Sequence, residues 1–266
     1  MRKLYELAGL LSIIGLLLAA APVLGQDETA SAAPKKEHSA EIKSLLEKVD
    51  QKVYSLQAAG LKDISFDIAP SMLSMMGVDN VVIHYEWKAP DKDRLTLKGD
   101  VPAGMDDMIK NQMKGLTELA VSKRFSTQFD EDDLTLTKEG AGYKLTASSQ
   151  SSDRKGTQTI FIGENYLPTK MEAEEETPMG PMNVSTDVSF TQSGDKNLIS
   201  GLKVSMAMGE QNLQFTYEEV GKYQVLKKIS IESPMMPAPM TVEFNNVKVD
   251  QGIPDSAFEE ESAGGK

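Results

Sequence analysis

The residues with the most distinctive chemistry in this sequence are its methionines, which gather in short phrases. SPMMPAPM spans residues 233–240 and TPMGPM spans 177–182, and further methionines lie in SMLSMMG (71–77), MDDMIKNQM (105–113) and SMAMG (205–209). Methionine is unbranched, has three rotatable bonds and carries a polarizable sulfur. Its clusters therefore indicate one of three roles: filling of an irregular core, lining of a cavity for flexible apolar ligands, or binding of Cu(I) through thioethers.

The copper interpretation depends on methionines that lie close together, as in SMAMG and PMMPAPM. Met206 and Met208 share one face of an expected strand, but that face is the apolar one, and no histidine lies nearby in the sequence. A surface lined by methionine can repack around differing apolar chains. Core filling and a ligand cavity both remain open at this point, with Cu(I) binding as a further alternative and no metal ligand assigned.

Signatures of catalysis are missing from the sequence. It contains no cysteine, which excludes disulfides, thiol catalysis, thiolate metal sites and a lipid anchor on cysteine. Of its two histidines, His38 lies in a polar segment and His84 shares the polar face of an expected strand with Glu86. We expect His84 to be solvated, with a metal site or a pH sensor as the alternative. Since no phosphate loop, zincin helix or nucleophile elbow is present, we predict that the chain is not an enzyme and assign no catalytic residue and no cofactor.

The N-terminal segment predicts export. Arg2 and Lys3 precede an apolar stretch from Leu7 to Ala21, and small residues around Gly25 suit cleavage there, so residues 1–25 are expected to be a signal peptide. Residues 26–38 are polar and predict a flexible spacer, residues 39–258 a single domain, and residues 259–266 a disordered tail. No later segment has the length of a membrane span, so a soluble periplasmic protein is expected.

The mature chain is strongly acidic. The signal segment carries two basic residues and one acidic residue, so its removal changes the formal charge from −12 to −13. Such a charge argues against a nucleic-acid partner, because phosphate binding depends on Lys and Arg.

Two segments have helical periodicity. From Ser39, a plausible N-cap, apolar residues recur with the spacing of one helix face as far as Leu56, and Gly60 predicts the stop. A second helix is expected from about Met105 to Phe125, with Gly115 inside it.

Nearly all the rest alternates with period two, which predicts about a dozen antiparallel strands with one apolar and one wet face. A phase slip after Phe244 predicts a bulge at Asn245–Asn246. Several runs are about ten residues long, and long twisted strands curl. The expected fold class is therefore mainly β with α: a strongly curved antiparallel sheet, or incomplete β-barrel, covered by two or more helices.

Two methionine phrases occupy equivalent places in this pattern. Residues 170–184 and 228–242 align without gaps, and each predicts a strand, a Pro/Met loop and a second strand. Because proline is excluded from central strands, both loops are expected at the ends of the sheet, on a rim.

Several phrases resemble the Lol-type lipoprotein carriers, the LolA/LolB-like family. An exported chain opens with the amphipathic segment SAEIKSLLEKVDQKVYSL, followed by a strand that ends in YEWKAPDKDRLTLKGD (85–100). A helical segment and a hairpin follow, then GENYLPTKMEAE (163–174) and the closing VEFNNVKVDQGIPDSAFE. The resemblance covers residues 39–260. It departs from the family at Ala89, where the best-known carriers have an arginine that holds the lid closed.

The resemblance implies an incomplete barrel whose mouth is filled by helices, and a periplasmic function in shielding the acyl chains of lipoproteins. Lipoprotein acyl chains or lipid are then the expected ligands, with a membrane-bound donor or acceptor protein as a further partner. A non-catalytic sensor or scaffold on the same fold is an alternative function.

The residues expected to form the ligand site fall into three groups. The wall is assigned to Tyr85, Trp87 and Phe215, and the lid to Met105, Met108 and Ile109. The rim is assigned to Met72, Met75, Met76, Met179, Met182, Met235 and Met236.

Overall fold

The computed structural model describes residues 36–75, 78, 81–101, 104–150, 155–177, 180–207, 209–234, 236 and 238–259. The predicted signal peptide, most of the predicted spacer and most of the predicted tail lie outside these residues. Two spacer residues already contact the domain: Lys36 pairs with Asp133, and His38 Nε2 lies 3.0 Å from the carbonyl oxygen of Phe129.

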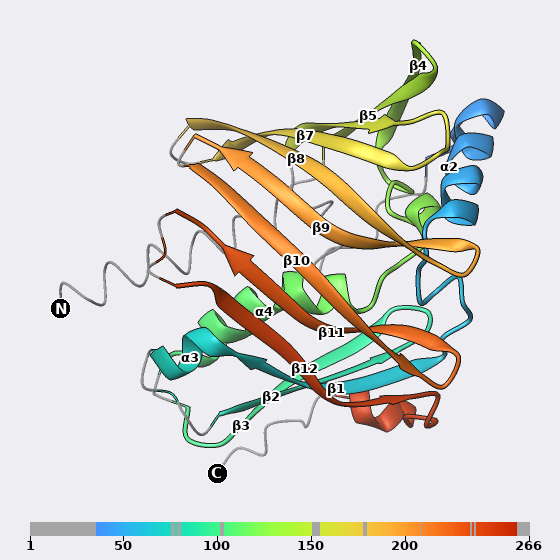
Figure 1. Cartoon of the computed structure of the whole chain (residues 1–266). Coiled ribbons are helices and arrows are strands. Elements are labelled where there is room, and N and C mark those ends of the chain that lie inside the picture. The colour runs from blue at the N-terminus through green and yellow to red at the C-terminus, as the bar shows by residue number, and fades with distance from the viewer. Residues whose placement is uncertain are drawn as a thin grey trace.

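Twelve strands form one open antiparallel sheet in the described part of the chain (Figure 1). The sheet order is β3-β2-β1-β12-β11-β10-β9-β8-β7-β6-β5-β4. The strands are β1 (Asp63–Pro70), β2 (Val82–Lys88), β3 (Lys92–Lys98), β4 (Asp133–Glu139), β5 (Gly142–Gln150), β6 (Lys155–Ile162), β7 (Pro168–Thr177), β8 (Gly180–Ser193), β9 (Lys196–Met206), β10 (Gly209–Val220), β11 (Tyr223–Glu232) and β12 (Met240–Val249). The prediction of about a dozen antiparallel strands is confirmed.

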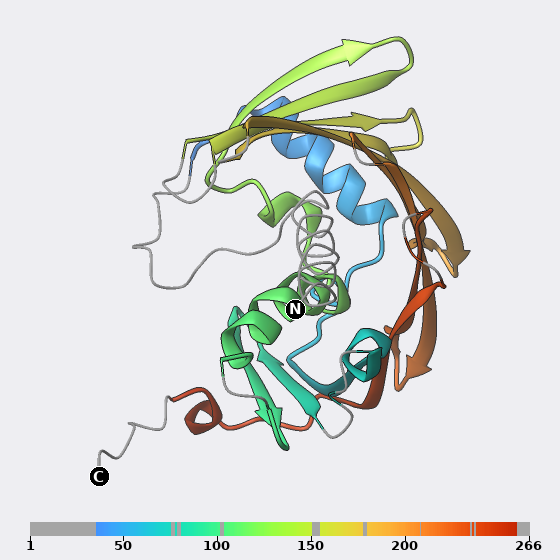
Figure 2. The same ribbon diagram turned by 90° about the vertical axis from the view of Figure 1, so that its left-hand side faces the viewer.

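Strands that are consecutive in the sequence are neighbours in the sheet, except for β3 and β4, which form its two edges. The pairing of β1 with β12 joins the first three strands to the last. In this pairing Asn246 and Val247 of β12 lie opposite the single residue Phe66, and Asn246 has φ 54°. The bulge therefore falls at Asn246–Val247, one residue beyond the predicted Asn245–Asn246. Figure 2 shows that the sheet curls into an arc, with the helices on its concave side.

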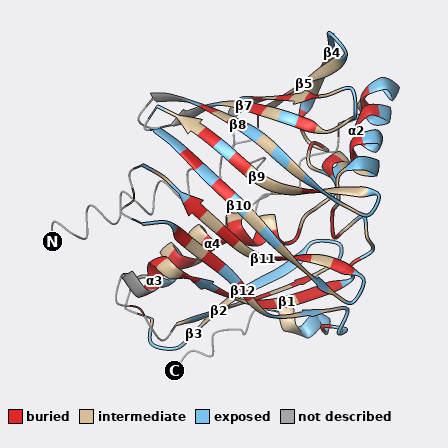
Figure 3. Cartoon of the chain, in the orientation of Figure 1, coloured by how far each residue is buried: buried red, intermediate tan, exposed pale blue. Residues whose placement is uncertain are grey.

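One face of the sheet is apolar and buried, as the alternation predicts (Figure 3). In β2, Ile83, Tyr85 and Trp87 are at most 3% exposed, whereas Val82 on the outer face is 45% exposed. The same alternation gives β1 its buried Ile64, Phe66 and Ile68.

The first predicted helix forms as α2 (Ala40–Lys52), and the Ser39 hydroxyl accepts a hydrogen bond from Ile42 N at 3.3 Å. The helix ends at Lys52 rather than near Gly60, so that part of the prediction is wrong. Asn197 at the start of β9 is the cause, because its side chain donates to the Lys52 carbonyl at 3.0 Å and its carbonyl accepts from Tyr54 N at 2.9 Å. These tertiary bonds replace the next helical ones.

The second predicted helix forms as α4 (Asp106–Ala120) and also ends early, before Phe125. The hydroxyl and carbonyl of Ser122 accept hydrogen bonds from Leu56 N and Gln57 N, which fixes the chain in a non-helical path. Three short elements complete the fold: α3 (Ser71–Met75) and the 3₁₀ helices η1 (Phe125–Thr127) and η2 (Asp255–Phe258).

The buried apolar residues form two separate clusters, one under each longer helix. The α2 core joins α2 and η1 to β5, β6 and β7, and consists of Ile42, Leu45, Leu46, Val49, Phe125, Phe129, Leu145, Ala147, Ile160, Ile162 and Met171. The α4 core joins α4 and α3 to strands β1, β2 and β8–β12, and includes Phe66, Ile83, Tyr85, Trp87, Ile109, Met113, Leu116, Val204, Leu213 and Phe244. Val188 packs against both cores, so one curved face carries two adjacent hydrophobic units.

We predict that Phe244→Ala lowers the free energy of unfolding by about 3–5 kcal/mol, because it opens a cavity in the α4 core. Phe244 is fully buried, and its ring meets that of Phe66 edge-on at 5.4 Å between centroids. Urea unfolding followed by circular dichroism measures the change. Val82→Ala on the outer face is the control and should stay within about 0.5 kcal/mol of the parent. A loss below about 1 kcal/mol for Phe244→Ala would contradict the described packing.

Candidate functional site

The predicted wall residues lie under α4. Tyr85 and Trp87 belong to the α4 core and are 3% and 2% exposed, whereas Phe215 of β10 is half-buried and packs against the same core. The structure thus places all three in one core on the concave face, although β10 lies four strands away from β2 in the sheet. The side chains of Tyr85 and Trp87 are buried and do not line an open cavity.

The predicted lid residues belong to the helix that covers this wall. Ile109 is fully buried in the α4 core, together with Met113 and Leu116 of the same helix, and Met105 and Met108 are half-buried against it. The apolar face of α4 is therefore part of the core on the concave side of the sheet, which also contains residues of β1, β2 and β8–β12. A chain of acyl carbons would have to displace this face in order to reach Tyr85 or Trp87.

A polar contact fastens α4 to the wall. The Tyr85 hydroxyl donates to Asp93 Oδ2 of β3 at 3.2 Å and also forms a hydrogen bond with the Thr117 side chain of α4. Burial, with the negative charge of Asp93, holds the pKa of Tyr85 well above its ordinary value, so the hydroxyl keeps its proton. Thr117, which is 1% exposed, was not singled out from the sequence.

The C-terminal end of α4 is anchored to the rest of the fold by several bonds. Besides the bonds to Ser122, Arg124 N donates to the Gln57 side chain at 2.9 Å, and Lys123 Nζ lies 3.1 Å from Asp91 Oδ1. These contacts hold one end of the helix. The C-terminal end of α4 is therefore a candidate hinge about which the N-terminal end of the helix could move.

Most methionines of the described chain lie along one rim of the sheet, whereas Met113 lies within α4 and Met171 in the α2 core. In an antiparallel meander alternate turns fall at the same edge, so the turns β7–β8, β9–β10 and β11–β12 share this rim with α3 and the N-terminal end of α4, on the left of Figure 1. The methionine rim is defined here as Met72, Met105, Met108, Met206, Met236 and Met240. The turns at the opposite rim, 89–91, 140–141, 163–167, 194–195, 221–222 and 250–252, contain no methionine.

The remaining predicted rim residues are described only in part. Met75 lies in α3 and Met182 in β8, but their side chains are not described. Met76, Met179 and Met235 lie outside the described residues, and so does Met208. Their assignment stays a prediction.

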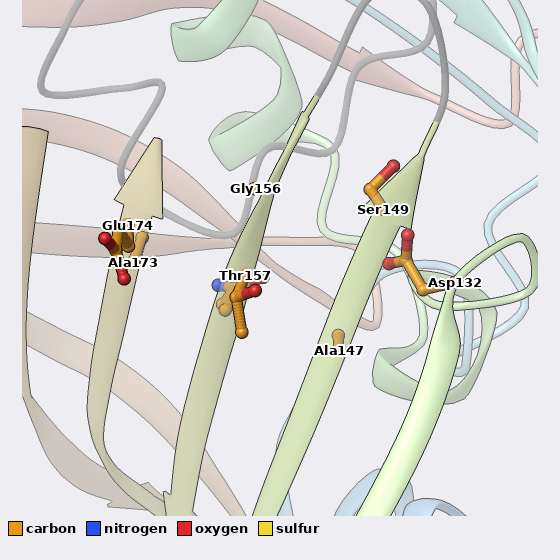
Figure 4. Close-up of a pocket in the computed structure, with 8 residues that line it drawn as sticks. Asp132, Ala147, Ser149, Gly156, Thr157, Ala173 and Glu174 are labelled. Carbon is orange, nitrogen blue, oxygen red and sulfur yellow. The ribbon is translucent and has the colours of Figure 1, made fainter. Parts of the chain in front are cut away.

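Two hollows stand out, and neither has the size and lining of an acyl-chain site. The first, shown in Figure 4, has a volume of about 10 Å³, which suits a single water, and lies among Asp132, Ala147, Ser149, Gly156, Thr157, Gln158, Ala173 and Glu174. The second has a volume of about 380 Å³, is open to solvent at the rim opposite the methionines, and is lined by Lys52, Glu164, Asn165, Tyr166, Leu167 and Asn197.

The Lys-Ala-Pro phrase at residues 88–90 does not hold α4. Lys88 Nζ donates to the Ile253 carbonyl and to Asp255 Oδ1, each at 2.8 Å, and so fixes the segment around η2. Arg94 pairs with Glu86 on the outer face, where its Nη2 lies 2.6 Å from Oε2.

His84 is half-buried and paired, so the expectation of a solvated side chain is wrong. Its Nδ1 lies 2.7 Å from Asp67 Oδ1 on the neighbouring strand, and Asn246 Nδ2 donates to Asp67 Oδ2 at 2.7 Å. Burial alone would raise the pKa of Asp67, but the hydrogen bonds from Asn246 and His84, with the charges of His84 and Lys98, outweigh it and lower the pKa. Within the described residues, no three His, Asp or Glu side chains are grouped so as to hold a metal ion.

Comparison with solved structures finds two chains of similar extent. A DUF1329 family protein from Desulfovibrio piger ATCC 29098 has 11% identity and a TM-score of 0.34 over 86% of this chain and 98% of its own. A putative outer membrane lipoprotein-sorting protein domain from Vibrio parahaemolyticus has 9% identity and a TM-score of 0.34 over 83% and 97%. The second has the kind of description that the sequence resemblance suggested, but superpositions this loose carry no argument about ligand or activity.

A third likeness is weaker still: MucB in complex with MucA(peri) has 10% identity and a TM-score of 0.18 over 80% of this chain and 95% of its own. No family model and no curated protein matches the sequence. None of the helices in the described ranges is both long and apolar enough to cross a membrane.

We predict that Tyr85→Phe loosens α4 selectively, because it removes the hydroxyl that joins the helix to β2 and β3. The amides of α4 should exchange with solvent about tenfold faster, corresponding to a loss of about 1–1.5 kcal/mol. Hydrogen–deuterium exchange measures this. The control is Tyr217→Phe, which removes a buried hydroxyl that donates to the Ile199 carbonyl at 2.9 Å in the sheet. Equal exchange of α4 in Tyr85→Phe and Tyr217→Phe would contradict the role given to Tyr85.

We predict that Asp67→Asn lowers stability at neutral pH by less than about 1 kcal/mol, because the group is partly exposed to solvent. The folded-state pKa of Asp67 lies below its ordinary value of 3.8, so the stabilisation is fully present above 3.8 and is lost as the pH falls through the lower folded-state value. Urea unfolding of both proteins between pH 7 and pH 2 tests this. A difference in stability that persists undiminished at pH 2 would contradict the account.

Proposed function

We propose that this chain is an exported carrier or binding protein that shields the acyl chains of lipids or lipoproteins on the concave face of its sheet. The observation that carries the proposal is the position of α4, whose apolar face packs in one core with the apolar side chains Tyr85 and Trp87, against which Phe215 also packs. This arrangement is what a carrier requires in its empty state, since an apolar groove without ligand must be kept from water.

If α4 moved away from the wall, the acyl chain of a ligand would take the place of the apolar face of the helix. Each methylene removed from water contributes about 0.8 kcal/mol, so a chain of sixteen carbons offers on the order of 12 kcal/mol, against which stand the costs of lifting α4 and of immobilising the ligand. The helix is fastened at its C-terminal end by Ser122 and Arg124, and its N-terminal end lies at the methionine rim. The rim is therefore the proposed entrance, and its flexible side chains suit acyl chains of differing shape.

We predict that brominated acyl chains quench the fluorescence of this protein. The chain has a single tryptophan, Trp87, which is buried in the proposed wall, so any quenching reports contact at that place. Titration of the mature protein with dibromostearic acid should quench saturably, whereas unbrominated stearic acid should not. Binding without quenching would place the ligand elsewhere, and absence of binding together with stoichiometric Cu(I) uptake in native mass spectrometry would favour the copper alternative.

We predict that Met108→Asp weakens acyl-chain binding about tenfold or more, because it places a charge on the apolar face of the lid. Asn111→Asp is the matched control: it introduces the same carboxylate on the exposed side of α4 and should leave affinity within about twofold. Isothermal titration calorimetry with stearic acid measures both. Equal affinities for the two variants would count against entry beneath α4.

A further inference from the structure

Two buried side chains on the apolar face of the sheet each carry an oxygen atom without a hydrogen-bond partner. Thr186 is 1% exposed and Gln211 is 4% exposed. Neither Thr186 Oγ1 nor Gln211 Oε1 has a hydrogen-bond partner in the structure as described. Buried polar groups are almost always paired in folded proteins, so each of these positions calls for a cause.

The two residues form one rung across three strands. Thr186 of β8 pairs with Val204 of β9, and Val204 pairs in turn with Gln211 of β10, so the polar side chains flank a buried valine on the same face. Val204 belongs to the α4 core, as do Leu202 and Leu213 of the next rung. Two residues from Val204 along β9 lies Met206 of the methionine rim. The polar rung therefore sits just inside the proposed entrance.

The two polar side chains are not expected to stabilise the folded state. A valine at 186 and a leucine at 211 would fill similar volumes without leaving a donor or acceptor unpaired, and an unpaired buried group destabilises the folded state. The chain thus carries a local cost at a place where its proposed ligand would pass. Such a cost is expected of a site whose partners arrive with the ligand.

We propose that Thr186 and Gln211 form a two-point hydrogen-bonding site for the amide linkage of an acyl chain; this inference rests on the proposed function. An amide has an N–H, which would donate to Gln211 Oε1, and a carbonyl on its opposite side, which would accept from the Thr186 hydroxyl. Two strand spacings separate the two backbones by roughly 10 Å. An amide with a hydrogen bond on each side spans about 8 Å, which is comparable to this separation of the two backbones.

This site gives the ligand class a chemical definition. An ester linkage has no N–H and would leave Gln211 Oε1 unpaired, and a site built for a hydrogen bond rejects an analogue that lacks it. The proposed substrates are therefore N-acylated molecules, in which the acyl chain lies along the wall and the amide lies at the rung.

The test compares N-palmitoylglycine methyl ester with the methyl ester of O-palmitoyl glycolic acid, which differ only in that N–H is replaced by oxygen. The wild-type mature protein should bind the amide about tenfold more tightly, measured by calorimetry. Thr186→Val/Gln211→Leu should bind both compounds with equal affinity, and no more tightly than the wild type binds the ester, because it lacks both hydrogen-bonding groups. Thr216→Val/Gln214→Leu, which makes the same changes at exposed positions on the outer face of β10, should keep the preference.

Equal binding of the two compounds by the wild type would overturn the amide site and leave acyl-chain binding intact, whereas binding of neither would overturn the proposed function as well. Urea unfolding gives a second readout. Thr186→Val/Gln211→Leu should unfold at the same or a higher urea concentration than the wild type, and a clearly lower midpoint would show that the two polar groups serve the fold.

Discussion

The structure depends on one constraint: a broad antiparallel sheet with a single apolar face must have that face kept from water. Twelve strands at about 4.8 Å spacing make a sheet about 50 Å wide, whereas α2 and α4, with 13 and 15 residues, are only about 20 Å and 22 Å long. Flat, the sheet would leave most of its apolar face exposed. Curling brings the two halves of the sheet around the helices, and the result is a core in two parts, one under each helix.

The need to cover the apolar face of the sheet also explains where the methionine rim lies. Strand order brings together phrases that are far apart in the sequence, at the edge where α3, the start of α4 and the tips of three hairpins meet. An edge of this kind has irregular gaps, and methionine fills such gaps without fixing a single arrangement. Core filling and ligand lining are therefore compatible roles for the same side chains. The acyl-carrier proposal needs both, since the rim must close over an empty groove and open around a ligand.

Much of this could be predicted from residue patterns, and the remainder could not, for physical reasons. Period-two alternation gave the strands and their buried face, and local chemistry gave the Ser39 cap and the bulge beside Asn246. The C-terminal ends of the two helices were predicted wrongly because hydrogen bonds between segments distant in the sequence determine them. Asn197 forms these bonds for α2 and Ser122 forms them for α4. The register of β8, β9 and β10 sets Thr186 beside Val204 and Gln211, and alternation along a single strand cannot show this. His84 pairs with Asp67 and not with Glu86 of its own strand. The pairing of β1 with β2 places Asp67 directly opposite His84, and this could not be seen from the sequence of β2 alone.

The central claim is that α4 moves away from the wall when an acyl chain enters. The chain contains no cysteine, so Asn111→Cys on the exposed side of α4 and Gln214→Cys on the outer face of β10 give one defined pair of spin labels. Pulsed electron–electron double resonance then measures the distance between helix and sheet. The account predicts one narrow distance in the empty protein and a second, longer distance that grows with added N-palmitoylglycine methyl ester. A distance distribution that stays unchanged while calorimetry shows stoichiometric binding would contradict it.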